Sequence, residues 1–258
     1  MNRTKKYLSG LVHLTLVITA VLFLSCTNEK PLGDVFNKGV PGNNTADLLR
    51  RVSTDVVALQ PDLVVVMVGT NDLLNTRKML SVGEYYNNMD LLTDSLLRHN
   101  ISVIVVSPPT ADSLHLFERH DSTLYPATPM KLLEAGSDTL RALCEKKDLV
   151  FVDLFSHLKE MGIPEHERDQ IIRNRANSDS NDGIHFTKEG NYLLARFIYE
   201  HLVANFDGPG SLKIVCFGDS ITCGVFMEGK GTTEGDTYPA VLKRLIKGES
   251  PQIIIERE

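Results

Sequence analysis

The distribution of apolar residues along the chain constrains its fold more than any other feature of the sequence. Short, continuous runs rich in Val and Ile alternate with longer segments in which apolar residues recur at helical spacing. Such runs are typical of parallel strands that are buried on both faces. The predicted strands are Leu63–Val68, Ile101–Val106, Leu149–Val152, Lys213–Phe217 and Gln252–Ile255. Their alternation with helices predicts an α/β fold, a three-layer α/β/α sandwich with a five-stranded parallel sheet.

Helical periodicity predicts the connections between these strands. Apolar residues recur at helical spacing in three segments. The first contains Leu48, Val52 and Val56, the second Tyr85, Met89, Leu92 and Leu96, and the third Leu132, Leu133, Leu140 and Leu143. A last helix is predicted from near Thr187 to Ala204, burying Leu193, Leu194, Phe197, Ile198 and Leu202. The segment Asp112–Pro129 has no clear period, and we expect a long surface excursion that helps to shape a pocket.

The N-terminal residues are predicted to be a targeting signal. Basic residues precede the apolar stretch Leu14–Leu24, which is well short of the about 20 residues that span a bilayer as a helix. Phe23-Leu24-Ser25-Cys26 resembles a bacterial lipoprotein processing site. We therefore expect a signal peptide at 1–25, a lipid on Cys26, a tether at 26–34, and an exported, membrane-anchored protein that faces the periplasm or the cell surface. Ordinary signal cleavage near the same place is the alternative.

Charge and cysteine content narrow the classes of partner. The net charge is −6, and the first 25 residues hold three basic and no acidic residues, so a processed chain is more acidic still. Nucleic acid is therefore not an expected partner. Besides Cys26, the chain holds Cys144, Cys216 and Cys223, whose spacing fits neither a disulfide framework nor a metal site. We expect them to be buried thiols.

Ser220 directly follows a predicted buried strand. The strand leads into Gly218-Asp219-Ser220, so a tight turn would expose the hydroxyl at the carboxyl edge of the sheet, where open α/β sheets bind ligands. An ordinary Gly-Asp-Ser turn is the alternative. The Gly-x-Ser-x-Gly elbow of α/β-hydrolases is excluded, because Thr222 occupies its final glycine position.

Two further segments offer donors for a developing oxyanion. Gly39 and Gly42 lie in a loop before a helix, where backbone amides can point at such a charge. Asn71 follows the most apolar strand within Gly69-Thr70-Asn71-Asp72, and its side chain can donate an N–H. A helix cap formed by Asn71 or Asp72 is the alternative.

Asp182 and His185 form the fourth candidate block. A carboxylate three residues before an imidazole can bond Nδ1 and leave Nε2 free, as the orienting acid and the base of a catalytic triad do. A solvated turn is the alternative for these two residues taken alone.

Together the four blocks resemble the signature blocks of the GDSL/SGNH hydrolase family, over residues 35–258 as a single domain. The resemblance implies an ester hydrolase that works through an acyl-enzyme, without a metal or an organic cofactor. It makes Ser220 the nucleophile, His185 the general base and Asp182 its orienting carboxylate. It also implies that the Ser220 amide, Asn71 and Gly42 form the oxyanion hole. Gly42 is chosen over Gly39 because it matches the position of the family's glycine.

The resemblance leaves the substrate open. We expect short-chain O-acyl esters, in particular acetyl esters of carbohydrates, because the candidate pocket segments Gly224–Asp236 and Asp112–Pro129 are polar and glycine-rich rather than apolar. An exported lipoprotein also meets glycans. A lysophospholipase or thioesterase is the alternative enzyme, and a non-catalytic glycan-binding lipoprotein is the alternative of another class.

The order of the blocks departs from that of the family. The nucleophile block, 213–222, comes last here and first in the family, and Phe186 replaces the proline often found after the histidine. We predict a circularly permuted, flavodoxin-like member whose serine strand lies between Leu63–Val68 and Gln252–Ile255, with Ile255 near Phe36 and new termini at Glu258 and near Gly33. The alternative, a truncated second domain at 211–258, leaves too few residues for a stable core.

Overall fold

The computed structural model describes residues 33–249, so the predicted signal peptide 1–25, Cys26 and the predicted strand Gln252–Ile255 lie outside the described residues. A single parallel sheet has the strand order β1-β5-β2-β3-β4. Its strands are β1 (Asp34–Gly39), β2 (Leu63–Met67), β3 (Ser102–Val106), β4 (Val150–Val152) and β5 (Lys213–Gly218). The predicted α/β fold with a five-stranded parallel sheet is confirmed.

The fifth strand is not the predicted one. β1 takes the place beside β5 that the sequence analysis assigned to Gln252–Ile255, and it pairs with β5 from Asp34 opposite Lys213 to Gly39 opposite Gly218. β1 is an edge strand in which only Val35 is buried, so no apolar run marks it in the sequence. The predicted glycine loop is correspondingly shorter, because Phe36 to Gly39 belong to β1.

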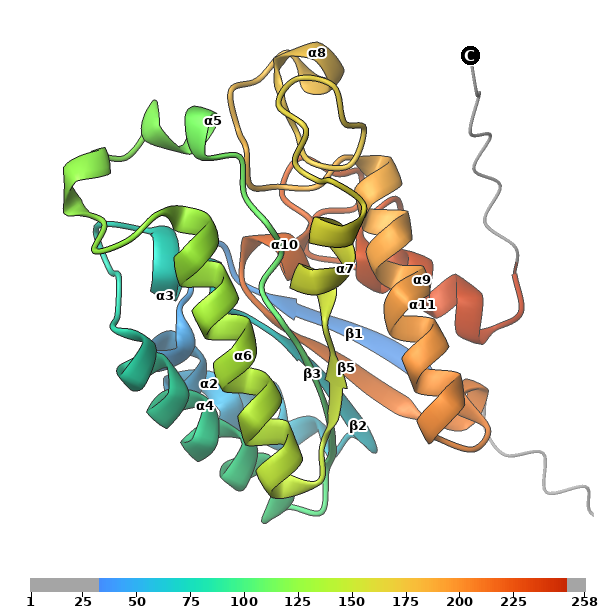
Figure 1. The fold of residues 1–258 in the computed structure, drawn as a ribbon. Helices are drawn as coiled ribbons and strands as arrows, with labels where there is room; N and C mark the ends of the chain where they lie inside the picture. The colour runs from blue at the N-terminus through green and yellow to red at the C-terminus, as the bar shows by residue number, and fades with distance from the viewer. Residues whose placement is uncertain (1–32, 250–258) are drawn as a thin grey trace, which may run out of the picture. The chain divides into compact units, whose positions relative to one another are not determined.

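Helices cover both faces of the sheet (Figure 1). On one face α2 (Thr45–Asp55), α4 (Val82–Leu97) and α6 (Pro129–Lys147) pack against Val64, Val66, Val103, Val105, Val215 and Phe217. On the other face α7 (Leu154–Glu160), α9 (Lys188–Asn205) and α11 (Tyr238–Ile246) pack against Leu63, Val65, Met67, Ile104, Val106, Ile214 and Cys216. Successive strand residues point to opposite faces, which is why the inner strands β2, β3 and β5 carry continuous apolar runs.

The predicted helices are present, with local signals that fix where they begin. Asn44 and Ser81 form capping boxes at the starts of α2 and α4, and Thr187 caps α9. In α9, Leu194, Ile198 and Leu202 are buried as predicted. Leu193 and Phe197 are only partly buried, because they line a surface groove.

Shorter helices were not predicted individually. They are α3 (Thr70–Leu74), α5 (Ser113–Phe117), α8 (Arg175–Ser178), α10 (Ser220–Cys223) and the 3-10 turns η1 (Val57–Leu59), η2 (Ser122–Leu124) and η3 (Pro209–Ser211). The segment Asp112–Pro129 is therefore partly helical, because Asp112 and Asp121 cap α5 and η2. Within residues 33–249, no helix is both long enough and apolar enough to cross a membrane. Cys144, Cys216 and Cys223 are buried free thiols.

Candidate active site

The carboxyl ends of β5 and β2 bring Ser220 and Asn71 to one edge of the sheet. Gly218, the last residue of β5, lies in register with Met67 at the end of β2, and Ser220 begins α10 two residues later. Arg51 on α2 fixes this edge, because its guanidinium donates to the carbonyl oxygens of Gly218 at 2.7 Å and Lys38 at 3.0 Å. The parallel arrangement thus gathers side chains from distant segments at the edge where α/β sheets bind ligands.

Ser220, His185 and Asp182 form one chain of hydrogen bonds. Ser220 Oγ lies 3.0 Å from His185 Nε2, although 35 positions separate the two residues. On the other side of the ring, His185 Nδ1 lies 2.9 Å from Asp182 Oδ2 and 3.0 Å from Oδ1. With the Nδ1 proton facing the carboxylate, Nε2 is left to accept the hydroxyl proton.

Asp182 is a buried carboxylate, and only 3% of its surface is exposed. Its Oδ1 accepts the backbone N–H groups of Ile184 and His185, each at 3.0 Å. Arg119 donates to the Asp182 carbonyl oxygen and lies 3.7 Å from Oδ1. Burial alone would raise the pKa of Asp182, but the hydrogen bonds and charge of His185, together with Arg119, outweigh it and lower the pKa to about 2. The carboxylate is therefore ionised at neutral pH and holds the His185 ring in place.

Two residues that the sequence analysis did not name cover His185. The Phe226 ring stands edge-on to the imidazole, with the ring centroids 5.3 Å apart. The Arg173 guanidinium lies over the Phe226 ring, 4.4 Å from its centroid. Phe226 belongs to the loop after α10 and has a φ of 73°. No sequence pattern marks it, since only the tertiary fold brings this loop to His185.

Asn71 borders the same site with its amide held in a defined orientation. Its Nδ2 donates to the Asn43 carbonyl oxygen at 3.0 Å and to Asp219 Oδ2 at 3.4 Å, while Oδ1 accepts from Asn75 Nδ2 at 3.0 Å. The alternative of a helix cap does not apply, because Gly69 is the N-cap of α3 and no side chain caps it. Asp72 instead binds the first residue of α2, accepting the Thr45 N–H at 2.9 Å.

The two glycines before α2 have different roles. A side chain at Gly39 would come within 2.0 Å of the Cys223 backbone nitrogen, so Gly39 lets α10 pack closely on β1. Gly42 has a φ of +76°, a conformation that favours glycine, and it precedes Asn43, whose carbonyl oxygen accepts from Asn71. The fold thus joins Gly42 to the site through this loop.

A cavity of about 110 Å³ opens beside Ser220 and His185. Its lining consists of Thr70, Asn71, Leu74, Asn75, Leu116, Arg119, His120, Ile184, His185 and Ser220. The predicted pocket segment Asp112–Pro129 supplies Leu116, Arg119 and His120. The other predicted segment, Gly224–Asp236, supplies Phe226 beside His185 but no lining residue, and Gly42 is also not among the lining residues.

The sequence matches the model of one known protein family. Residues 25–193, more than half of the chain, match the model of the GDSL-like Lipase/Acylhydrolase family. The matched residues include Gly42, Asn71, Asp182 and His185, and they end before Ser220.

The individual relatives described next share a quarter or less of their residues with this chain. An uncharacterized lipoprotein, YqeF, of Bacillus subtilis (strain 168) is 24% identical over 185 residues, which cover 67% of this chain and 74% of the relative. Among solved structures, a lipase/acylhydrolase from Enterococcus faecalis has a TM-score of 0.50 at 23% identity, covering 67% of this chain and 74% of that one. A Parabacteroides merdae protein described as a GDSL-like lipase has a TM-score of 0.50 at 25% identity, covering 64% and 70%.

Proposed function

Because the chain belongs to the GDSL-like lipase/acylhydrolase family, and is a carboxylic ester hydrolase, we propose that it cleaves short-chain O-acyl esters with Ser220, His185 and Asp182. The observation that carries this proposal is the continuous hydrogen-bonded chain from Asp182 through His185 to the Ser220 hydroxyl. This is the arrangement by which a base activates a serine while a carboxylate orients the base.

The mechanism follows from the positions of these groups. His185 Nε2 takes the proton as Ser220 Oγ attacks the ester carbonyl, and the same nitrogen then protonates the departing alcohol. Water, activated by His185, hydrolyses the acyl-enzyme. The Ser220 amide, the Gly42 amide and Asn71 Nδ2 stabilise the oxyanion, and the long 3.4 Å contact between Asn71 and Asp219 is the one that the oxyanion replaces.

Removing the Asn71 donor tests this assignment. The variant Asn71→Ala should lower kcat by about 10²–10³-fold with a smaller effect on KM, as expected when one oxyanion donor is lost. Steady-state kinetics with p-nitrophenyl acetate measure the effect, and Asn205→Ala, which removes an exposed asparagine on α9, is the matched control. A change confined to KM would make Asn71 a substrate-binding residue instead.

The small cavity supports a short acyl group. Typical pockets for small organic ligands occupy roughly 300–1,000 Å³, whereas the cavity beside Ser220 has about 110 Å³. Asn75, Arg119 and His120 give it a polar rim, which suits a carbohydrate ester better than a lipid chain. We therefore favour acetyl esters of carbohydrates over the substrates of a lysophospholipase or thioesterase.

A series of p-nitrophenyl esters tests the substrate class. We expect kcat/KM to fall steadily from acetyl to octanoyl, because the longer chains exceed the cavity. Release of acetate from an O-acetylated xylan oligosaccharide then tests the carbohydrate part. A maximum at octanoyl or beyond would favour the lipolytic alternative.

We further propose that the domain, residues 35–258, is a circular permutation of the family's usual order. If β5 is counted first, the strand order β1-β5-β2-β3-β4 becomes 2-1-3-4-5, which is the flavodoxin-like order. The family match, which ends at residue 193 and so omits the Ser220 block, agrees with this rearrangement.

We also propose that the protein is exported and anchored to a membrane through a lipid on Cys26. Two observations support this: the sequence Phe23-Leu24-Ser25-Cys26 and the naming of the B. subtilis relative as a lipoprotein. The lipid would hold the hydrolase at the membrane surface, facing ester-bearing glycans of the periplasm or the cell exterior.

A further inference from the structure

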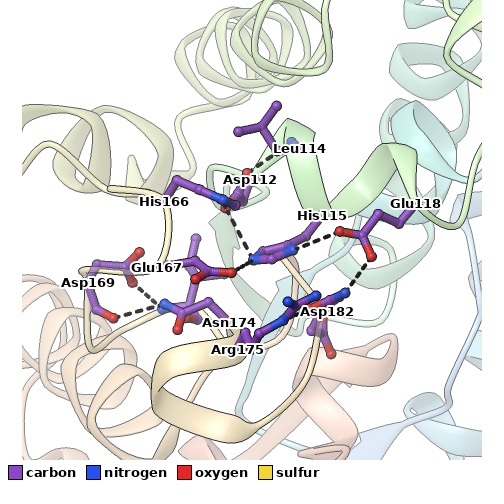
Figure 2. A network of polar contacts seen from close by, with 12 residues as sticks. Asp112, Leu114, His115, Glu118, His166, Glu167, Asp169, Asn174, Arg175 and Asp182 are labelled. Atoms are coloured by element: carbon purple, nitrogen blue, oxygen red, sulfur yellow. Dashed lines mark hydrogen bonds and ion pairs between the residues drawn. The ribbon is translucent and has the colours of Figure 1, made fainter.

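A second cluster of titratable side chains surrounds His115, near Asp182 (Figure 2). Asp112 and His115 come from the start of α5, and His166 and Glu167 come from the segment after α7. The proposed hydrolysis uses none of these four side chains. About fifty positions separate the two pairs in the sequence, so no local motif marks them as ligands.

His115 is the residue that makes this cluster unusual. Only 1% of its surface is exposed, and neither ring nitrogen has a hydrogen-bond partner among the described residues. Its nearest polar neighbours lie at ion-pair distances, with Nδ1 3.5 Å from Glu118 Oε1 and Nε2 3.6 Å from Glu167 Oε1. Buried polar groups are nearly always satisfied, and leaving them unpaired costs free energy. An additional ligand at Nε2 would remove that cost.

The atoms around His115 Nε2 have the spacing of a metal site. Asp112 Oδ2 lies 3.9 Å from this nitrogen, and one ligand atom each from Asp112, His115 and His166 lie within 4.8 Å of one another. Bonds of 2.0–2.2 Å to a tetrahedral ion would place ligand atoms about 3.3 Å apart. His166 Nδ1, now 2.5 Å from Asp112 Oδ2, must withdraw slightly, and its half-exposed side chain is free to do so.

We propose that Asp112, His115 and His166 bind a divalent transition-metal ion such as zinc. Glu167, whose Oε1 lies 3.6 Å from His115 Nε2, would move closer to Asp112 and His166 to serve as a fourth ligand. Imidazole and carboxylate ligands suit zinc, whereas calcium and magnesium prefer oxygen ligands alone. Glu118 is placed to accept the Nδ1 proton of His115, which fixes the tautomer that leaves Nε2 for the metal.

The proposed metal site lies next to the turn that carries the Asp182 and His185 side chains. The Asp112 N–H donates to the Gly183 carbonyl oxygen at 2.8 Å, directly beside Asp182. Arg119, one turn beyond His115, donates to the Asp182 carbonyl oxygen and lines the cavity together with Leu116. The metal ion would therefore link α5 to the segment after α7. Because Asp112 and Arg119 already bind the turn that carries Asp182 and His185, this link would also stabilise that turn.

Isothermal titration calorimetry with ZnCl₂ as the probe tests the proposal. The full-length chain is first freed of metal with EDTA and is kept in detergent. We expect one zinc ion per chain, an upward shift of Tm on zinc addition, and no comparable binding of CaCl₂ or MgCl₂. The variants His115→Ala and His166→Ala should each weaken zinc binding by at least about tenfold, since even loss of an outer partner of a ligand costs 10–100-fold. His99→Ala, which removes an exposed histidine, is the matched control and should bind zinc as the wild type does.

The outcome is decisive even if His115→Ala fails to fold. His166→Ala changes a half-exposed side chain, and Asp112→Asn keeps the oxygen that caps α5, so circular dichroism should show both to be folded. Absence of stoichiometric zinc binding by the wild type would overturn the proposal. Equal zinc binding by the wild type, His166→Ala and Asp112→Asn would overturn it as well. All of these measurements are independent of ester hydrolysis.

Discussion

Replacing Ser220 by alanine is expected to lower kcat for p-nitrophenyl acetate by about 10⁶-fold, the loss seen when a serine protease loses its nucleophile. The reason is that Oγ forms the acyl-enzyme in the proposed mechanism, and no other hydroxyl contacts His185 Nε2 among the described residues. Removing Oγ breaks only its hydrogen bond to His185, so the fold should be retained. Ser53→Ala, which changes an exposed serine on α2, is the matched control.

Initial-rate measurements with purified variants decide this prediction. Circular dichroism and Tm must first show that Ser220→Ala is folded. Activity close to that of the wild type in a folded Ser220→Ala variant would remove Ser220 from the mechanism.

The second large effect is expected for Asp182→Asn, which should lower kcat by about 10⁴-fold, by analogy with the corresponding change in a serine protease. The amide can present an N–H group to His185 Nδ1, which favours the tautomer whose proton sits on Nε2, and that tautomer cannot accept the Ser220 proton. The matched control is Asp179→Asn, because Asp179 is exposed, lies close in sequence and has a φ of 49°, which asparagine tolerates.

Thermal stability, measured beside kcat, distinguishes this role from a structural one. Burial raises the pKa of Asp182, but His185 and Arg119 lower it to about 2, so the carboxylate stays ionised across the working range. The stability that its depressed pKa provides is present above the ordinary value of 3.8 and is lost only as the pH falls toward 2. If Asp182→Asn lost activity merely by unfolding, the variant would already be unfolded at the assay temperature. A variant that is folded at that temperature, with a Tm lowered by the lost carboxylate and a kcat lowered far more, is the expected result.

The sequence predicted the interior of the fold better than its margins. The inner strands β2, β3 and β5 are buried on both faces, so each leaves a continuous apolar run that periodicity detects. β4 is an edge strand and only partly buried, but its three residues are all apolar, so the pattern marked it as well. β1 lies at the edge of the sheet and needs no such run, so the glycine-loop pattern concealed it and Gln252–Ile255 was assigned its place.

Site residues that lie in local sequence blocks could likewise be predicted, whereas those brought together only by the tertiary fold could not. Ser220, Asn71, Asp182 and His185 lie in short sequence blocks whose spacing reflects local turns, so the blocks could be recognised one at a time. Phe226 and Arg119 reach Asp182 and His185 from separate loops. The pairing of His115 with His166 likewise exists only in the folded chain. Residues of this kind carry no local signal, because tertiary packing alone creates their contacts.

Labelling with a fluorophosphonate, which phosphonylates activated serines, tests most directly the central claim that Ser220 is the nucleophile of this hydrolase. Intact mass followed by peptide mass spectrometry should show one adduct, on Ser220, in the wild type. The adduct should be absent from Ser220→Ala and should form much more slowly in Asp182→Asn. No adduct on the folded wild-type protein, or an adduct on another residue that persists in Ser220→Ala, would contradict the claim.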